Sequence, residues 1–149
     1  PAKTTDTNAV SYSARGTKYG DVVRTSDRAI TTDRSKNTGG KGQGVTSTGL
    51  YMSALAVSCS QAVREAAKGM QLDDVRVEVN HNGDGTFTRL ITLYGDLTEE
   101  QVETLRAAGA SSTVDGYVEK GEIETTAETA SLERRRRQNK LHRSERLGK

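Results

Sequence analysis

The most apolar stretch of this 149-residue chain is Leu50–Val63, and its helical continuation reaches Lys68. Apolar side chains recur there every three or four residues, which is the period of a helix that buries one face. A hydroxyl within Thr46–Thr48 can cap the first free amides, and Gly69 can end the helix in the left-handed conformation. The pattern therefore predicts one largely buried helix whose inner face is formed by Met52, Leu55, Ala56, Cys59, Val63 and Ala66.

Alternation of apolar and polar residues predicts strands on both sides of this helix. Val75–Asn80 and Thr86–Tyr94 flank the turn sequence NGDG, which is typical of a β-hairpin. Before the helix, the segments SYSAR, DVVRT and RAITT predict two or three short strands between residues 10 and 32. The glycine-rich run NTGGKGQG follows them, and it lacks the Gly-Lys-Ser/Thr ending of a phosphate loop. We therefore expect it to be a flexible connection.

A second helix is predicted after the hairpin. Thr98 and Gln101 have the spacing of a capping box, in which each side chain bonds the other residue's backbone amide. Gly109 is predicted to end this helix, and residues 114–118 and 121–126 to add a turn and a closing strand. Strands, one buried helix, a hairpin and a surface helix together predict an α+β fold with helices on one face of an antiparallel sheet. The residues expected to face inward from the second helix are Val102, Leu105 and Ala108.

Composition makes the predicted core thin. Only 32% of residues are hydrophobic and 4% are aromatic, while ordering each residue costs about 1–2 kcal/mol. We therefore expect a partner subunit to contribute to stability. The single cysteine rules out an intramolecular disulfide and favours a reducing, cytoplasmic compartment. No run approaches the roughly 20 apolar residues of a membrane span, and the first ten residues have no apolar signal core.

Charge is divided unevenly along the chain. Residues 132–149 carry a net charge of +6 and the remainder carries −4. We therefore expect a flexible lead at residues 1–9, one domain at 10–131 and a basic extension at 132–149. The extension is either a solvated tail or a surface for phosphates or an acidic protein. Because no aromatic residue interleaves with its arginines, nucleic-acid contact would be non-specific. The cluster consists of Arg134, Arg135, Arg136 and Arg137.

Three stretches together resemble the family of osmotically inducible protein C and the organic hydroperoxide resistance proteins (OsmC/Ohr). They are GKGQGVTSTGLYMSALAVSCSQAV, GMQLDDVRVEVN and GDLTEEQVETLRAAGASSTVDGYV, within residues 10 to 126. The first corresponds to the family's glycine-rich entry to a central helix that bears a reactive cysteine. The resemblance implies an OsmC-like fold, with an antiparallel sheet packed on a central buried helix in an intertwined homodimer.

The same resemblance implies a site that reduces organic hydroperoxides with a thiol. Cys59 lies at the position of the peroxide-attacking cysteine. The family also uses an arginine from the N-terminal half of the chain. Arg15, Arg24 and Arg34 are candidates here, and Arg34 is favoured because it directly precedes the glycine-rich run.

Two departures from the family pattern change this expectation. A second cysteine usually stands in a Cys-Pro-Val motif, and this chain has Ser112-Thr113-Val114 there. The family tends to place Pro-Glu at the start of the central helix, and this chain has Thr48-Gly49-Leu50. Turnover would therefore need an external thiol reductant, because Ser112 cannot form a disulfide. No cofactor is expected, and one cysteine with two distant histidines does not make a zinc site.

Two functions stay open from the sequence. Cys59 either reduces hydroperoxides as a thiolate, or it fills space in the core, as free cysteines often do. In the second case the chain is a catalytically inactive OsmC-fold protein that binds a small apolar ligand, or a protein or nucleic-acid partner through its basic tail. A thiolate needs a nearby cation and access for the peroxide. The surroundings of the Cys59 sulfur therefore distinguish the two functions.

Overall fold

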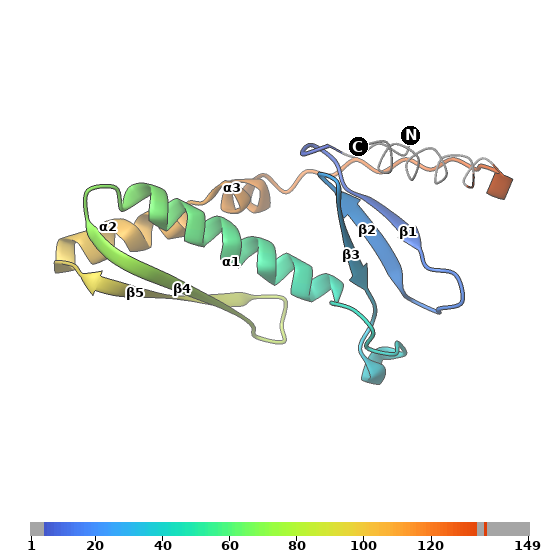
Figure 1. Ribbon diagram of the computed structural model, residues 1–149, viewed down its shortest axis with the longest axis horizontal. Helices are drawn as coiled ribbons and strands as arrows, with labels where there is room; N and C mark the ends of the chain where they lie inside the picture. Colours follow the sequence, from blue (N-terminus) through green and yellow to red (C-terminus); the bar gives the residue numbers. More distant parts are fainter. Residues whose placement is uncertain (1–4, 134–135, 137–149) are drawn as a thin grey trace. The chain divides into compact units, whose positions relative to one another are not determined.

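The computed structural model describes residues 5–133 and Arg136 (Figure 1). The chain divides into two compact units, one formed by residues up to Ser47 together with those from Glu124 onward, and the other by Thr48–Ile123. Arg134, Arg135 and Arg137 lie outside the described residues. The phosphate or acidic-protein contact expected of the arginine cluster therefore stays a prediction, as do the domain boundaries at residues 10 and 132.

The first unit contains a three-stranded antiparallel sheet in the order β1-β2-β3. Its strands are β1 (Val10–Ser13), β2 (Asp21–Thr25) and β3 (Arg28–Thr32). The prediction of two or three short strands is confirmed, and there are three. Ser26 and Asp27 join β2 to β3 with positive φ angles of 48° and 61°. This is the left-handed geometry that two-residue hairpin turns favour, because it matches the twist of the strands.

The glycine-rich run is an ordered loop. It contains a short 3-10 helix, η1 (Lys36–Thr38), and returns to the sheet where Val45 pairs in parallel with Thr32. The Asp33 amide donates to the Val45 carbonyl at 3.0 Å, which closes the base of the loop. The expectation of a flexible connection is therefore wrong, because backbone hydrogen bonds hold this segment together.

The second unit begins with the long helix α1 (Ser47–Ala66). Its first residue falls within the predicted start, and Gly69 has a φ of +84° just after its end. The predicted inner face is the covered one, with Leu55, Cys59 and Val63 buried. Within the described residues, the structure has no helix of the length and apolar character that crossing a membrane requires.

A long antiparallel hairpin follows α1, formed by β4 (Gln71–His81) and β5 (Phe87–Asp96). Figure 1 shows α1 running along this hairpin. Val75 pairs with Leu93 and Val77 with Ile91, and these four side chains pack against the buried core. The hairpin is confirmed, and the strands form two antiparallel sheets within the described part of the chain. The α+β class is therefore confirmed, and the intertwined dimer stays a prediction.

Two helices complete the second unit, α2 (Glu99–Ala110) and α3 (Thr113–Lys120). The Thr98–Gln101 capping box is confirmed. Gly109 was expected to end α2, and this is wrong: Gly109 does not adopt a left-handed φ, and the helix runs to Ala110 with Ser111 as its C-cap. The expected turn at 114–118 is instead helix α3, and residues 121–126 form no strand. A second capping box at Ser112, which the sequence analysis missed, starts α3.

The core of the second unit is small and includes the cysteine. Cys59, Val63 and Leu105 are fully buried, and Ala67 joins them. Val102 is 42% exposed, so its predicted inward position is wrong. Gly109 faces the core beside Leu105, since both are buried on α2. The partly buried side chains packed against this core are Ala66, Met70, Leu72, Val75, Val77, Ile91, Leu93 and Leu97.

Two glycine substitutions test this packing. A Cβ on Gly109 would lie 2.7 Å from Ile91 Cδ1 and 2.9 Å from Cys59 Sγ, whereas one on Gly116 would meet nothing within 4 Å. We expect Gly109→Ala to lower the free energy of unfolding by about 1–3 kcal/mol through overpacking. Gly116→Ala should leave it unchanged or raise it by up to about 1 kcal/mol through helix propensity. Urea denaturation measures both, and equal effects would contradict the close approach at Gly109.

Candidate functional site

Cys59 lies in the most enclosed part of the second unit. Its exposed fraction is 0%, and Val63 and Leu105 pack with it in the core. Burial raises the pKa of the thiol, because a thiolate is poorly solvated there. The charge of Arg89 acts in the opposite direction, that of Asp115 adds to the rise, and the pKa is raised overall. The thiol is therefore protonated at neutral pH.

The cation near this thiol is Arg89 on β5. Its Nη1 donates to the Leu55 carbonyl at 3.4 Å and its Nη2 to the Gly109 carbonyl at 3.0 Å. The same two nitrogens bind both carboxylate oxygens of Asp115, at 3.2 and 3.1 Å. One guanidinium thus joins β5 to α1, to the end of α2 and to α3. This forked geometry is the strongest form of an arginine–carboxylate pair.

Arg89 is not among the site residues predicted from the sequence, although the chain carries a signal for it. Residues on one face of a strand alternate, so Arg89 falls on the same face of β5 as Phe87 and Ile91. A charged residue on the apolar face of a strand needs a partner when it is buried. That requirement points to a buried ion pair, but periodicity alone does not identify Asp115.

Ser112, which the resemblance predicts to stand where the family has a second cysteine, stabilises the start of α3. It is 4% exposed and is the N-cap of α3. Its backbone amide and its hydroxyl both donate to Asp115 Oδ2, at 3.0 and 2.7 Å. Burial alone would raise the pKa of Asp115, but the hydrogen bonds from Arg89 and Ser112 outweigh it, so the pKa is lowered. Ser112 therefore holds Asp115 ionised beside Arg89.

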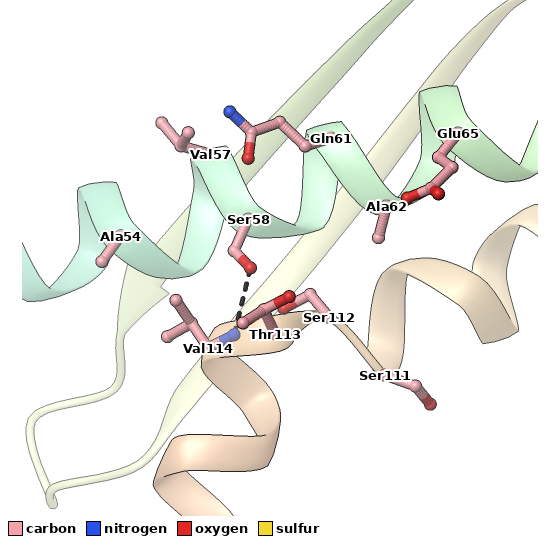
Figure 2. A pocket seen from close by; sticks show the side chains of 10 residues that line it. All are labelled: Ala54, Val57, Ser58, Gln61, Ala62, Glu65, Ser111, Ser112, Thr113 and Val114. Carbon is pink, nitrogen blue, oxygen red and sulfur yellow. Dashed lines mark hydrogen bonds between the residues drawn. The ribbon is translucent and has the colours of Figure 1, made fainter. Parts of the chain in front are cut away.

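A cavity of about 530 Å³ lies between α1 and the segment that joins α2 to α3 (Figure 2). Ser58 forms part of its wall, and Ser58 Oγ accepts a hydrogen bond from the Val114 amide at 3.1 Å. Cys59 follows Ser58 in the chain but does not line the cavity, so the sulfur faces the core and the hydroxyl faces the opening. The lining residues are Ala54, Val57, Ser58, Gln61, Ala62, Glu65, Ser111, Ser112, Thr113 and Val114.

The predicted catalytic arginines lie in the first unit. The guanidinium carbon of Arg34 is 4.0 Å from the centre of the Tyr19 ring. Arg24 is on β2, and Arg15 is exposed between β1 and β2. The two units are described separately, so the pairing of Arg34 with Cys59 stays a prediction.

Metal ligands do not gather in the described part of the chain, where no group of three or more histidine, cysteine, aspartate or glutamate side chains could hold an ion. His81 is exposed at the end of β4 and stacks on Phe87, with ring centres 4.8 Å apart. His142 lies outside the described residues. The arrangement around Cys59 therefore consists of an enclosed neutral thiol and of Arg89, whose charge is balanced by Asp115. Beside them lies a cavity lined by hydroxyl, amide and aliphatic groups.

Neutralising one carboxylate tests the role of the buried ion pair. Asp115→Asn should lower the free energy of unfolding at pH 7 by about 1–3 kcal/mol, because it leaves the partly buried Arg89 without a charged partner. The pKa of Asp115 is lowered in the folded protein. The ionised carboxylate therefore contributes fully to the free energy of unfolding above the ordinary carboxyl pKa of about 3.9. It is lost as the pH falls through the folded value. The difference between the two proteins should therefore shrink toward pH 3 in urea titrations.

A matched control is available on the surface of α2. Glu103 pairs with Arg106 at 2.6 Å, but both side chains are more than half exposed. Glu103→Gln should change the free energy of unfolding by no more than about 0.5 kcal/mol. If Asp115→Asn cost as little as this control, the ion pair would not hold the three helices together.

Comparison with known proteins supports the architecture. No family model matches this sequence, and no curated protein matches it significantly. Several solved structures share the fold. An OsmC like protein from Mycoplasma pneumoniae matches at TM-score 0.61 and 12% identity, covering 76% of this chain and 87% of its own. A Psychrobacter arcticus protein named for osmotic stress induction and the detoxification response matches at TM-score 0.59 and 16% identity. The match covers 72% of this chain and 85% of the Psychrobacter arcticus chain.

The third is a Legionella pneumophila protein named organic hydroperoxide resistance protein OsmC, predicted redox protein. It matches at TM-score 0.52 and 19% identity, covering 78% of this chain and 90% of its own. All three sequence identities are 19% or lower, so the similarity shows a shared fold and does not show a shared activity. The resemblance seen in the sequence is confirmed at that level: this chain has the OsmC-like fold.

Proposed function

We propose that this chain is a divergent member of the OsmC/Ohr family that has kept the fold without a working peroxidase centre. It binds instead a small molecule with an apolar part in the cavity beside α1. One observation carries the proposal: the Cys59 sulfur is fully buried, and the cavity next to it is lined by Ser58 and Ser112. The site thus presents hydroxyls where peroxide chemistry would need a thiolate.

Peroxide reduction requires an ionised and reachable sulfur. Here burial raises the pKa of Cys59, and the nearby Arg89 shares its charge with Asp115. After attack, the sulfenic acid would also need a thiol for its reduction, and Ser112 cannot supply one. Each of these features works against turnover.

The cavity has properties suited to binding. Its volume of about 530 Å³ falls within the range of small-molecule pockets, which is roughly 300–1,000 Å³. Figure 2 shows Ala54 and Val57 toward one end and Glu65 toward the other. Ser58 and Ser112 lie between them. A ligand with an aliphatic part and a polar head fits such a graded wall.

We also propose that the protein is an intertwined homodimer in a reducing compartment such as the cytoplasm. The thin core and the single cysteine support this. A stable monomer in sedimentation at low micromolar concentration would contradict the dimer.

The cavity can be filled by one substitution. Ala62→Phe places a ring in it, whereas Ala107→Phe makes the same change on an exposed position of α2 outside the lining. With the neutral fluorescent probe N-phenyl-1-naphthylamine, we expect wild type and Ala107→Phe to bind equally. Ala62→Phe should weaken binding about tenfold, which is about 1.4 kcal/mol. Equal binding by both variants, or none by the wild type, would exclude this cavity as the binding site.

A second candidate function is reduction of organic hydroperoxides by Cys59 with an external thiol reductant. The charge of Arg89, which opposes the rise in the pKa of Cys59 that burial causes, favours it. So does the name of the Legionella pneumophila structure. In this case Arg34, or Arg89 freed from Asp115, would stabilise the thiolate.

Turnover separates the two candidates. Consumption of cumene hydroperoxide with dithiothreitol, corrected for the uncatalysed reaction, is compared between wild type and Cys59→Ser. The first proposal predicts equal rates and no sulfenic acid trapped by dimedone. A rate that depends on Cys59 would replace the binding proposal with the enzymatic one.

A further inference from the structure

The glycine-rich loop of the first unit is organised around one buried carboxylate. Asp33, directly after β3, is 7% exposed. Its Oδ1 accepts the Arg34 amide at 2.7 Å, and its Oδ2 accepts the amides of Lys41 and Gln43 at 3.0 and 3.3 Å. Burial alone would raise the pKa of Asp33, but these three bonds outweigh it and lower the pKa. One side chain therefore fixes both ends of the loop.

Backbone contacts close the loop further. The Gly42 amide donates to the Arg34 carbonyl at 3.1 Å, and the Gly40 amide to the Ser35 carbonyl at 3.0 Å. Gly40 is required by this geometry, because a Cβ there would lie 2.0 Å from the Arg34 carbonyl oxygen. Such a compact loop, held by its own contacts, keeps the backbone that carries its basic side chains in one arrangement.

Basic side chains cover the outside of this loop. Arg34 stacks on the Tyr19 ring, and the Lys18 amine lies 5.3 Å from the same ring centre. Lys36 and Lys41 are exposed on the loop itself. In the part of the chain that the structure describes, none of these four cations pairs with a carboxylate within 4.0 Å. Asp33 is the loop's only acidic side chain, and its oxygens are turned to backbone amides.

We propose that the loop from Arg34 to Gly44, with Lys18 beside it, is a preorganised binding site for phosphate groups. Phosphate oxygens suit both the fork of an arginine and the point charge of a lysine. Because the loop backbone is already ordered, the entropy cost of ordering it is not added on binding. The proposed site shares no residue with the lining of the cavity beside α1. The phosphates can come from a free polyphosphate or from a nucleic-acid backbone.

The decisive variant is Asp33→Asn. It makes the protein one unit more positive, so attraction by net charge alone predicts tighter binding of sodium tripolyphosphate. The loop proposal predicts weaker binding, by about fivefold or more, because an NH2 donor takes the place of one of the two carboxylate oxygens that accept backbone amides. Calorimetry at about 50 mM salt measures the affinity. An affinity equal to or above that of the wild type would overturn the proposal.

A second pair of variants leaves the loop backbone untouched. Lys36→Gln with Lys41→Gln removes two charges from the loop, and Lys68→Gln with Lys120→Gln removes two exposed charges from the second unit. We expect about a fivefold loss of tripolyphosphate affinity in the loop pair and little change in the control pair. Amide NMR shifts should fall on Gly39–Gly42. Equal losses in both pairs, or shifts confined to residues 132–149, would overturn the proposal.

The source of the phosphate is decided by a further titration. An oligothymidylate of ten nucleotides is compared with tripolyphosphate in the loop pair and the wild type. A loop-dependent affinity for the oligonucleotide supports a nucleic-acid backbone as the source, and a loop-dependent affinity for tripolyphosphate alone supports a free polyphosphate. Loss of loop dependence for both ligands would contradict the site.

Discussion

The ion pair between Arg89 and Asp115 determines the arrangement of the second unit. A two-stranded hairpin has little stability on its own, and the fully buried core beneath it consists of few side chains. Arg89 reaches from the hairpin to carbonyl oxygens of α1 and α2 and to a carboxylate of α3. A partly buried charge of this kind is costly unless every donor finds an acceptor. The position of α3, and with it the wall of the cavity, follows from that requirement.

The same pair explains why the thiol and the cavity are separate. Gly109 packs against Cys59 while its carbonyl accepts a bond from Arg89, so the end of α2 covers the sulfur. Ser112 then turns the chain into α3 and places its hydroxyl on Asp115. A cation that would otherwise favour a thiolate is occupied by a carboxylate. Ser58, one residue before Cys59, is left to face the opening.

Most elements of the fold could be predicted from local sequence patterns. The period of α1, the NGDG hairpin and the Thr98 capping box depend on neighbouring residues, so the sequence was sufficient for them. Gly109 was misjudged because glycine ends helices in one context and permits close packing in another, and only the contact with Cys59 decides between them. The Asp33 loop was missed for a similar reason, because its carboxylate accepts amides eight and ten residues further along the chain. The Ser112 cap is a local pattern like that of Thr98, with Asp115 three residues on, and the sequence therefore contained the signal for it.

The candidate site was predictable in part. The position of Cys59 on the inner face of α1 followed from periodicity, and its burial agrees with that face. The cation near the thiol could not be predicted from periodicity. Arg89 is 30 residues further along the chain, and only the packing of β5 on α1 brings it close to Cys59. Ser112 was identified by position, but its bond to Asp115 depends on the start of α3. Chemistry at this site is therefore set by contacts between elements rather than by any one motif.

The central claim is that the Cys59 sulfur is enclosed and protonated in the folded protein. The most direct measurement is the rate at which 5,5′-dithiobis(2-nitrobenzoic acid) modifies it at pH 7, with and without denaturing urea. We predict that the folded protein reacts at least about a thousandfold more slowly than the unfolded chain, at a rate set by its opening equilibrium. Modification of the folded protein within seconds, as for an exposed thiolate, would contradict the account.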